Sequence, residues 1–245
     1  MLRRKSIKII IIVAVVLLII AVSVFVMLWN GIILLNNPSK DAYPIRGVDV
    51  SSYQGEIDWN TLSKQNIQFA FIKATEGSSF IDPNFSSNYE NAQKTSLRIG
   101  AYHFFSYDSS GKTQAENFIK TVPKIDNMLP PVVDVEFYGD KEQNPPDSKD
   151  VQKELDDFLY QIEEYYNKRP IIYATEKSYD MFISEKYNNY NIWIRNVICY
   201  PSISDGRTWT FWQYTNRAVL NGYNGSEKFI DMNVFNGSKE DFEKL

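Results

Sequence analysis

The chain has 245 residues, of which 44% are hydrophobic and 15% aromatic, so it can bury a full core and need not be disordered. Residues 1–30 contain four basic and no acidic residues, which leaves 22 basic against 30 acidic residues in the remainder and makes that part a poor nucleic-acid binder. Because Cys199 is the only cysteine and His103 the only histidine, an intramolecular disulfide and a Cys/His zinc cluster are excluded. We expect no metal and no cofactor.

An almost unbroken apolar run near the N-terminus predicts a transmembrane helix. About 20 apolar residues rising about 1.5 Å each span about 30 Å, the thickness of a bilayer's hydrocarbon core. Basic residues precede the run and uncharged or mixed polar residues follow it, which predicts a cytoplasmic N-terminus with the rest of the chain outside. The expected divisions are a basic tail (1–8), a transmembrane anchor (9–29), a linker (30–44) and one domain (45–245).

A cleaved signal peptide is the competing interpretation of the same run. The small residues Ala21, Val22 and Ser23 could serve as a cleavage site. The apolar run continues past this site to Leu28, however, and Trp29 then suits the membrane interface. The uncleaved anchor is therefore the favoured interpretation, with secretion after cleavage as the alternative.

The domain alternates strand-like and helix-like segments. Short β-branched or aromatic runs predict eight strands, at residues 46–51, 69–75, 98–105, 130–138, 170–175, 191–194, 210–214 and 229–234. Helices are expected over 83–96, from a capping box at Thr113 and Glu116 to near Pro123, and along the apolar periodicity from Val151 to Tyr166. This order predicts an α/β fold, an irregular TIM-like (β/α) barrel of eight strands with some helices missing, preceded by one transmembrane helix.

The fourth predicted strand carries two carboxylates, Asp134 and Glu136, two residues apart. Side chains at i and i+2 share one face of a strand, so both point into the same space. Alone, a solvated strand face is the commoner explanation. In a (β/α) barrel, polar residues at strand ends face the active-site mouth. Other polar residues at or near strand ends are Asp49, Glu76, His103 and Asp231. Several carboxylates converging from separate strands are hard to explain by solvation.

Aromatic residues accompany these polar positions. They are Tyr53, Tyr102, Phe104, Phe105, Tyr138, Tyr173, Trp193, Trp212 and Tyr214. Core packing explains them as well as substrate binding does, although sugar-binding clefts need flat apolar faces beside polar groups. His103 is more often a hydrogen-bonded core or cleft residue than a general base, and Cys199 is expected to be a buried, inert thiol.

Taken together, the motifs of the domain resemble the family 25 glycoside hydrolases, the Chalaropsis-type lysozymes. The resemblance runs from Gly47 to about Phe235. Its motifs are Asp49–Gly55 with Asp58-Trp59, Phe71–Gly77, Gly100–Phe105, Asp134-Val135-Glu136, Trp212–Tyr214 and Asp231–Asn233. Each motif is weak alone, and in this order the set is highly specific.

The resemblance implies an N-acetylmuramidase that hydrolyses the β-1,4 bond between N-acetylmuramic acid and N-acetylglucosamine in peptidoglycan. It implies Glu136 as general acid, Asp134 as its partner, and Asp49 and Asp231 as further catalytic carboxylates of the cleft. Of two close carboxyl groups, one should have its pKa raised by the charge of the other, as an acid catalyst requires. Substrate contacts are expected from Tyr53, Glu76, Tyr102, His103, Phe104, Tyr138, Tyr173, Trp193, Trp212 and Gln213.

Sequence spacing leaves the role of Asp134 open. Carboxylates about 5 to 5.5 Å apart favour a covalent nucleophile, and those about 6.5 to 9.5 Å apart favour an inverting base. The implied substrate also carries a 2-acetamido group, which could itself attack the anomeric carbon while Asp134 orients and stabilises it. This substrate-assisted route is the hypothesis we favour.

The sequence departs from the family pattern after Trp193-Ile194, where Arg195-Asn196 replaces a small residue and an aromatic. Wall-binding repeats, carried by many relatives, are not evident, and the anchor could replace them by holding the enzyme at the membrane's outer face. The expected partners are peptidoglycan glycan strands and, through the helix, the membrane. Local wall opening for a cell-envelope or conjugation apparatus is a further hypothesis.

Two other functions compete with the muramidase. One is a catalytically inactive, membrane-tethered peptidoglycan-binding module, and the other a barrel hydrolase of another polymer such as chitin. Retention of the four predicted catalytic carboxylates argues against the inactive module.

Overall fold

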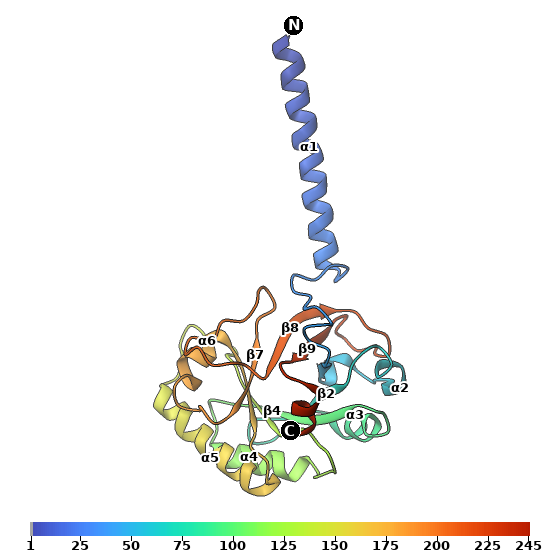
Figure 1. Ribbon diagram of the computed structural model, residues 1–245. Helices are drawn as coiled ribbons and strands as arrows, with labels where there is room; N and C mark the ends of the chain where they lie inside the picture. Colours follow the sequence, from blue (N-terminus) through green and yellow to red (C-terminus); the bar gives the residue numbers. More distant parts are fainter. Residues whose placement is uncertain (1) are drawn as a thin grey trace.

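The computed structural model describes residues 2–245, with side chains from Ser6 onward. A long helix, α1 (Leu2–Trp29), projects away from the domain that holds all other elements (Figure 1). Its backbone is helical through most of the predicted basic tail, while the side chains of Arg3, Arg4 and Lys5 lie outside the described residues. Within the described chain, one helix, Ser6–Trp29, is long and apolar enough to cross a membrane.

Eight strands close into a barrel, as predicted. They are β1 (Arg46–Val50), β2 (Phe69–Glu76), β4 (Arg98–Phe104), β5 (Val132–Val135), β6 (Ile171–Thr175), β7 (Asn191–Arg195), β8 (Phe211–Ala218) and β9 (Ile230–Phe235). Neighbours from β1 round to β8 are parallel, whereas β9 is antiparallel to both β8 and β1 and closes the ring. A short strand, β3 (Phe80–Ile81), pairs with the end of β2 outside the ring.

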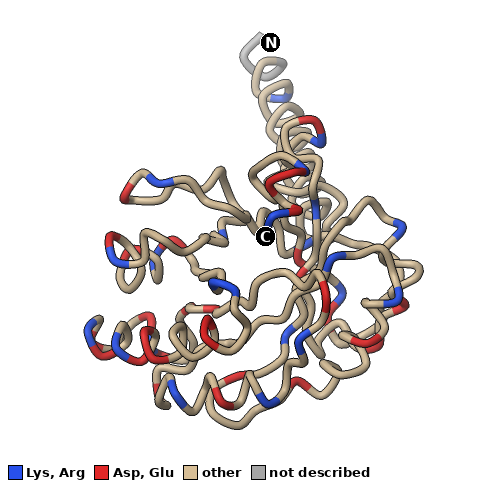
Figure 2. The backbone as a smooth tube through the Cα atoms, turned by 60° about the horizontal axis from the view of Figure 1, so that its bottom comes forward, with Lys and Arg blue, Asp and Glu red and all other residues tan. Residues whose placement is uncertain are grey.

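Helices cover the barrel unevenly, with the longer ones between β2 and β6 (Figure 1). They are α2 (Trp59–Leu62), α3 (Phe85–Ala92), α4 (Gly111–Thr121), α5 (Ser148–Tyr166), α6 (Glu176–Ser178) and α7 (Lys239–Glu243), with a 3₁₀ turn at Ser52–Gln54 and a π turn at Tyr179–Ile183. Charged residues lie mainly on these helices and the loops (Figure 2). The predicted capping box is wrong, because α4 begins earlier and the Oγ of Ser110 accepts the N–H of Thr113 at 3.3 Å.

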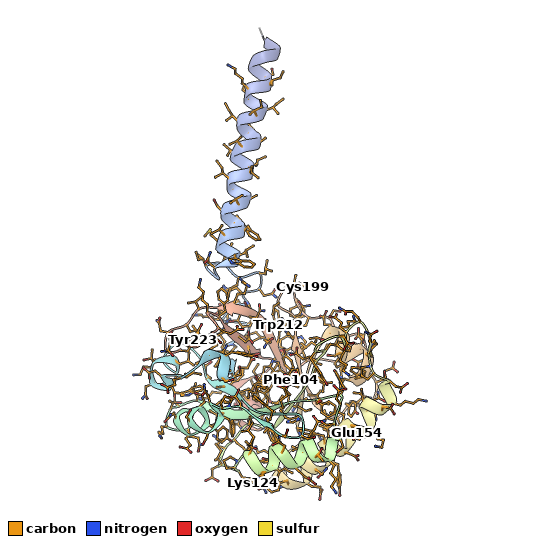
Figure 3. All side chains as sticks on the ribbon, turned by 180° about the vertical axis from the view of Figure 1, so that it is seen from behind. Phe104, Lys124, Glu154, Cys199, Trp212 and Tyr223 are labelled. Carbon is orange, nitrogen blue, oxygen red and sulfur yellow. The ribbon has the colours of Figure 1, made fainter. Side chains whose placement is uncertain are left out.

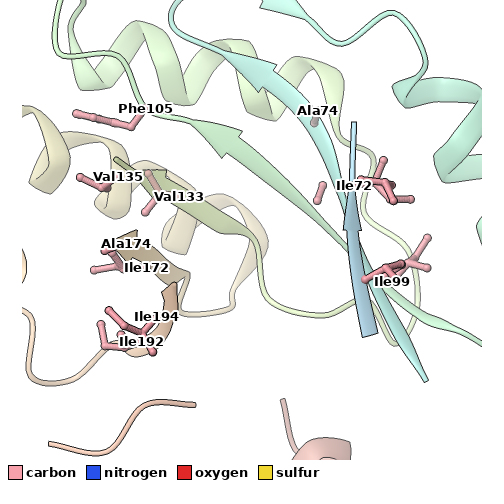
Figure 4. Close-up of a cluster of buried hydrophobic side chains, with 14 of the residues drawn as sticks. Ile72, Ala74, Ile99, Phe105, Val133, Val135, Ile172, Ala174, Ile192 and Ile194 are labelled. Carbon is pink, nitrogen blue, oxygen red and sulfur yellow. The ribbon is translucent and has the colours of Figure 1, made fainter. Parts of the chain in front are cut away.

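Strand alternation divides the core into two layers. Side chains of one parity point outward under the helices, and Figure 4 shows Ile72, Val133 and Ile172 among them, all fully buried. Side chains of the other parity fill the barrel interior with a mainly aromatic cluster that includes Phe71. Gly100 makes room for this filling, since a Cβ there would lie 2.7 Å from the Phe71 ring.

The apolar filling occupies one end of the barrel only. Phe242 of α7 packs against Phe69, Phe211 and Phe235, with ring centroids 5.6, 6.5 and 5.2 Å away, and so closes the end where the parallel strands begin. Polar interior residues therefore collect at the opposite end, where the parallel strands finish.

The loop after β7, residues 196–209, runs over the outside of the barrel near the foot of α1 (Figure 3). The side-chain carbonyl of Asn196 accepts the N–H of Cys199 at 2.9 Å, and this turn leaves the thiol exposed. The prediction of a buried Cys199 is therefore wrong.

Candidate active site

The ends of the parallel strands surround a cleft of about 650 Å³. All four predicted catalytic carboxylates line it: Asp49, Asp134, Glu136 and Asp231. Six of the predicted substrate-binding residues line it too: Tyr53, Tyr102, Phe104, Tyr173, Trp193 and Gln213. Phe104 lies near the middle of the domain in Figure 3.

Asp231 reaches the cleft by a different route from the one predicted. We expected it at the C-terminal end of a parallel strand, but it lies near the start of β9, which runs antiparallel. Because the direction is reversed, the beginning of β9 lies among the C-terminal ends of the other strands. There Asp231 is the direct cross-strand neighbour of Asp49.

Asp49 is held by a chain of side-chain hydrogen bonds. Gln213 donates from Nε2 to both carboxylate oxygens of Asp49 at 3.1 and 3.0 Å, and Asn233 donates from Nδ2 at 2.7 Å. The Tyr173 hydroxyl donates to Gln213 Oε1 at 3.0 Å, and Trp193 Nε1 donates to Asn233 Oδ1 at 2.8 Å. The outer donors fix each amide so that its N–H groups face Asp49, which favours an ionised carboxylate.

Asp49 and Asp231 differ in how strongly their surroundings raise the pKa of the carboxyl group. Burial raises the pKa of Asp49, while its amide donors act against that shift. Burial also raises the pKa of Asp231, and the neighbouring Asp49 charge and a hydrogen bond to Asp49 raise it further. Asp231 therefore holds a proton more readily than Asp49 does.

Asp134 and Glu136 form the second carboxyl pair, on β5 and just beyond its end. Burial is the main cause that raises the pKa of both, and the charge of Glu136 raises that of Asp134 further. The pair therefore keeps a proton at a pH where carboxyl groups in water have lost theirs. Asp134 is 7% exposed, whereas Glu136 is half-buried and nearer the opening.

Two of the three cations that line the cleft, Lys73 and Arg195, oppose these shifts by lowering the pKa of Asp134 and of Glu136. Lys73 pairs with Glu76 at 2.8 Å. Neither cation was among the predicted site residues, although alternation could have found them, since each follows an interior aromatic, Phe71 or Trp193, by two residues. Other lining residues that sequence reasoning missed are Val50, Ser51, Gln54, Phe137, Glu142, Thr175, Lys177, Asn216 and Glu227.

Four predicted substrate-binding residues do not line the cleft: Glu76, His103, Tyr138 and Trp212. Glu76 lies beside it as the partner of Lys73. The Tyr138 hydroxyl accepts the N–H of Tyr107 at 2.9 Å and donates to Asp108 Oδ2 at 2.9 Å, so it organises the adjacent loop.

His103 and Trp212 do not line the cleft because side chains alternate along a strand. Their neighbours Tyr102 and Gln213 face the cleft, so His103 and Trp212 face outward. His103 is fully buried, bonded to Thr75 Oγ1 at 2.7 Å and to Gln114 Oε1 at 3.0 Å, and burial lowers its pKa to about 4. Trp212 is also buried and donates from Nε1 to the carbonyl of Asn196 at 2.8 Å.

The cleft places carboxyl groups that keep a proton beside inward-facing aromatic rings. This arrangement is suited to acid–base cleavage of a sugar polymer. Among the described residues, no group of three or more His, Cys, Asp or Glu side chains is arranged to hold a metal ion.

Comparison with known proteins identifies relatives of the whole domain. The model of the glycosyl hydrolases family 25 matches residues 48–223. The uncharacterized protein YegX of Escherichia coli O157:H7 is 36% identical over 207 residues, which cover 82% of this chain and 73% of that protein. Lysozyme M1 of Streptomyces globisporus is 31% identical over 215 residues, covering 81% and 70%. A solved family 25 glycosyl hydrolase from Bacillus anthracis superimposes with a TM-score of 0.81 and 59% identity, covering 85% of this chain and 96% of that one.

Proposed function

Because the chain belongs to family 25 of the glycosyl hydrolases, we propose that it cleaves the β-1,4 bond between N-acetylmuramic acid and N-acetylglucosamine at the outer face of a membrane. Family membership makes it a muramidase-type glycoside hydrolase with peptidoglycan as substrate. The observation that carries the proposal is the pair of carboxyl groups, Asp134 and Glu136, whose raised pKa values keep a proton inside the cleft.

Glu136 is the proposed general acid. It lies beyond the end of β5 and nearer the opening than Asp134, so it can reach a glycosidic oxygen that enters from outside. Substrate would displace the remaining water around Glu136 and so raise its pKa further, which draws the shared proton of the pair toward it.

Asp134 is the proposed partner of the substrate's acetamido group. Its Oδ1 is buried and has no hydrogen-bond partner among the described residues, so it can accept the acetamido N–H. Glu136 gives its proton to the leaving oxygen while the acetamido carbonyl oxygen bonds to the anomeric carbon. Water, losing a proton to Glu136, then opens the resulting ring and restores both groups.

The stereochemistry of the product tests this route. Two displacements at the anomeric carbon retain its configuration, which NMR of fresh product detects. An inverted product, or a covalent glycosyl adduct on Asp134 seen by mass spectrometry, would rule the route out.

Lys73 and Arg195 are the proposed binders of the substrate's negative charge. N-acetylmuramic acid carries a carboxylate, through its lactyl group or the attached peptide, that N-acetylglucosamine lacks. These two cations, in a cleft lined by more acidic than basic residues, would favour that sugar. Trp193, Tyr173 and Phe104 offer aromatic faces in the same cleft.

The identity of new reducing ends tests the bond specificity. The full chain in detergent would be incubated with purified peptidoglycan, and the ends reduced and identified by mass spectrometry. Muramic acid ends are the expected result, and glucosamine ends would contradict the proposal. Binding without release by the wild type would instead favour the inactive binding module, and cleavage of chitin alone would favour the other hydrolase.

We propose that α1 is retained as an anchor with its N-terminus in the cytoplasm. Its apolar part, Ser6–Trp29, is long enough to span a bilayer and is not buried by the domain. Mass spectrometry of the mature N-terminus in the membrane fraction tests this. A product that starts after Ser23, or full-length protein soluble in the medium, would contradict both the anchor and local wall opening for a cell-envelope or conjugation apparatus.

A further inference from the structure

The domain carries exposed apolar side chains around the foot of α1. They are Trp29, Ile32, Leu35, Ile198, Tyr200 and Val219, each between 53% and 71% exposed, and they form what we call the apolar collar. They come from the end of α1, the segment after it, the 196–209 loop and the turn after β8. A soluble surface rarely gathers this many large apolar side chains at one place without a partner.

Hydrogen bonds hold the parts of the collar together. Asn36 donates from Nδ2 to the carbonyls of Asn196, Cys199 and Tyr214 at 3.1, 3.3 and 3.2 Å, which ties the segment after α1 to the loop that carries Ile198 and Tyr200. Tyr43 packs against Trp209 of the same loop, with ring centroids 5.7 Å apart.

Further contacts fix the foot of α1 itself. The Arg217 guanidinium lies 4.9 Å from the Trp29 ring and bonds to the Trp29 carbonyl, and Lys228 donates to Asn30 Oδ1 at 3.1 Å. Ile32 and Val219 line one hollow beside this foot. The predicted linker is therefore docked on β8 and its neighbouring loops, and the collar has a fixed position relative to α1.

We propose that the apolar collar is a second membrane contact, seated in the interfacial layer of the bilayer that α1 spans. The proposal rests on the anchor proposed above. The collar begins where the apolar helix ends, so a membrane around α1 meets it without rearrangement. Trp29 and Tyr200 have the amphipathic rings that prefer the interface, and Arg217 and Lys228 can contact lipid phosphates.

Seating the collar would set the height of the active site. Asn216 and Glu227, which line the cleft, adjoin Arg217 and Lys228 at the foot of α1. This edge of the cleft would lie near the lipid head groups, and the opposite side, where Figure 3 shows Lys124 and Glu154, would face outward. The enzyme would then cut glycan strands close to the membrane.

The single cysteine allows a direct test, because Cys199 is exposed and lies between Ile198 and Tyr200. The full chain would be labelled there with an environment-sensitive fluorophore and reconstituted into phosphatidylglycerol-containing vesicles. The matched control carries Cys199→Ser and Lys124→Cys, which places the label on the exposed far side. Seating in the interface should shift the emission of the Cys199 label to shorter wavelength, and shallow nitroxide-labelled lipids should quench it. Neither change is expected for the control.

Each outcome decides the proposal. Vesicle flotation with equal, weak quenching at both sites would overturn the collar contact and leave the anchor intact. Failure to float would overturn both. A shifted emission without lipid quenching would show a second copy of the chain covering the collar and would also overturn the proposal. Ile198→Glu should reduce quenching of the Cys199 label while flotation and turnover stay at wild-type levels, and undiminished quenching in this variant would overturn the collar contact. In the labelled chain without this substitution, absent turnover with intact quenching would count against the muramidase alone.

Discussion

Burial shifts the pKa of each key residue toward its neutral form, so the pKa of a base falls and the pKa of an acid rises. Burial favours the neutral form of His103 and lowers its pKa, whereas it raises the pKa values of Asp134 and Glu136, so that this pair keeps a proton. The same desolvation therefore leaves a neutral core residue on the outer face of β4 and a proton on the carboxyl pair in the cleft.

Because the chain has a single histidine, the lowered pKa of His103 can be measured without overlap from other histidines. We expect one set of imidazole resonances in the NMR spectrum of the full chain in detergent, titrating near the pKa of about 4. A pKa near the ordinary 6.5 would contradict the buried placement. Because the folded pKa is depressed, the unfolded chain binds a proton at His103 more readily than the folded chain does. The free energy of unfolding therefore falls as pH drops from 6.5 toward 4, by up to about 3 kcal/mol at about 1.4 kcal/mol per unit.

Asp134 is expected to give the opposite dependence of stability on pH. Its folded pKa is raised, so its stability cost is absent below the ordinary carboxyl range and grows as pH rises through the window up to the raised value. Asp134→Asn should therefore stabilise the domain at pH 7, by about 1.4 kcal/mol for each unit of the shift, and leave its stability unchanged at low pH. Urea unfolding followed by tryptophan fluorescence measures the difference. The exposed control Asp126→Asn should show none; a destabilised Asp134→Asn at pH 7 would refute this account.

Much of the site could be predicted residue by residue from the sequence, and the errors have two physical causes. The four carboxylates reach the cleft because they have the interior parity of their strands. His103 and Trp212 were chosen as members of conspicuous motifs, although alternation forbids them from sharing a face with Tyr102 and Gln213. Glu142 and Glu227 lie on loops without periodicity, so no local pattern could place them.

Within each strand, side chains that face inward fill the barrel or line the cleft, and side chains that face outward pack under the helices and loops. Trp193 on β7 faces inward and donates to the amide that supports Asp49, whereas Trp212 on β8 faces outward and donates to a loop carbonyl. The two tryptophans form a matched pair on adjacent strands.

Replacing each tryptophan by phenylalanine should therefore give different results. Trp193→Phe frees the Asn233 amide and should lower kcat about tenfold, equivalent to about 1.4 kcal/mol. Trp212→Phe loses one hydrogen bond and should lower the free energy of unfolding by about 1 kcal/mol while kcat stays within about twofold. Steady-state kinetics and urea unfolding of both variants check this; equal kinetic losses would contradict the assigned faces.

All eight strands could be predicted because buried strands are rich in β-branched and aromatic residues, a local signal. The direction of β9 could not, since a pattern of period two reads the same both ways. The start of α4 was misplaced because Ser110 and Thr113 are both good caps, and tertiary packing decides between them.

The whole molecule joins an apolar helix, long enough to span a membrane, to a barrel through a docked segment rather than a free linker. Sequence composition predicted a linker over 30–44 because residues 36–44 are polar and contain two prolines. Its docking depends on contacts such as Asn36 with Tyr214, 178 residues apart, which no local pattern reveals. The apolar helix and the barrel thereby become parts of one assembly.

Turnover by Glu136→Gln tests the central claim most directly, namely that a proton held in this cleft cleaves peptidoglycan. Wild type, Glu136→Gln and the exposed control Glu116→Gln would be compared as full chains for binding to sacculi and for release of reducing ends. We expect Glu136→Gln to lose about 10²- to 10⁴-fold in turnover with binding intact, and the control to match wild type. Activity of Glu136→Gln within a few-fold of wild type would contradict the account.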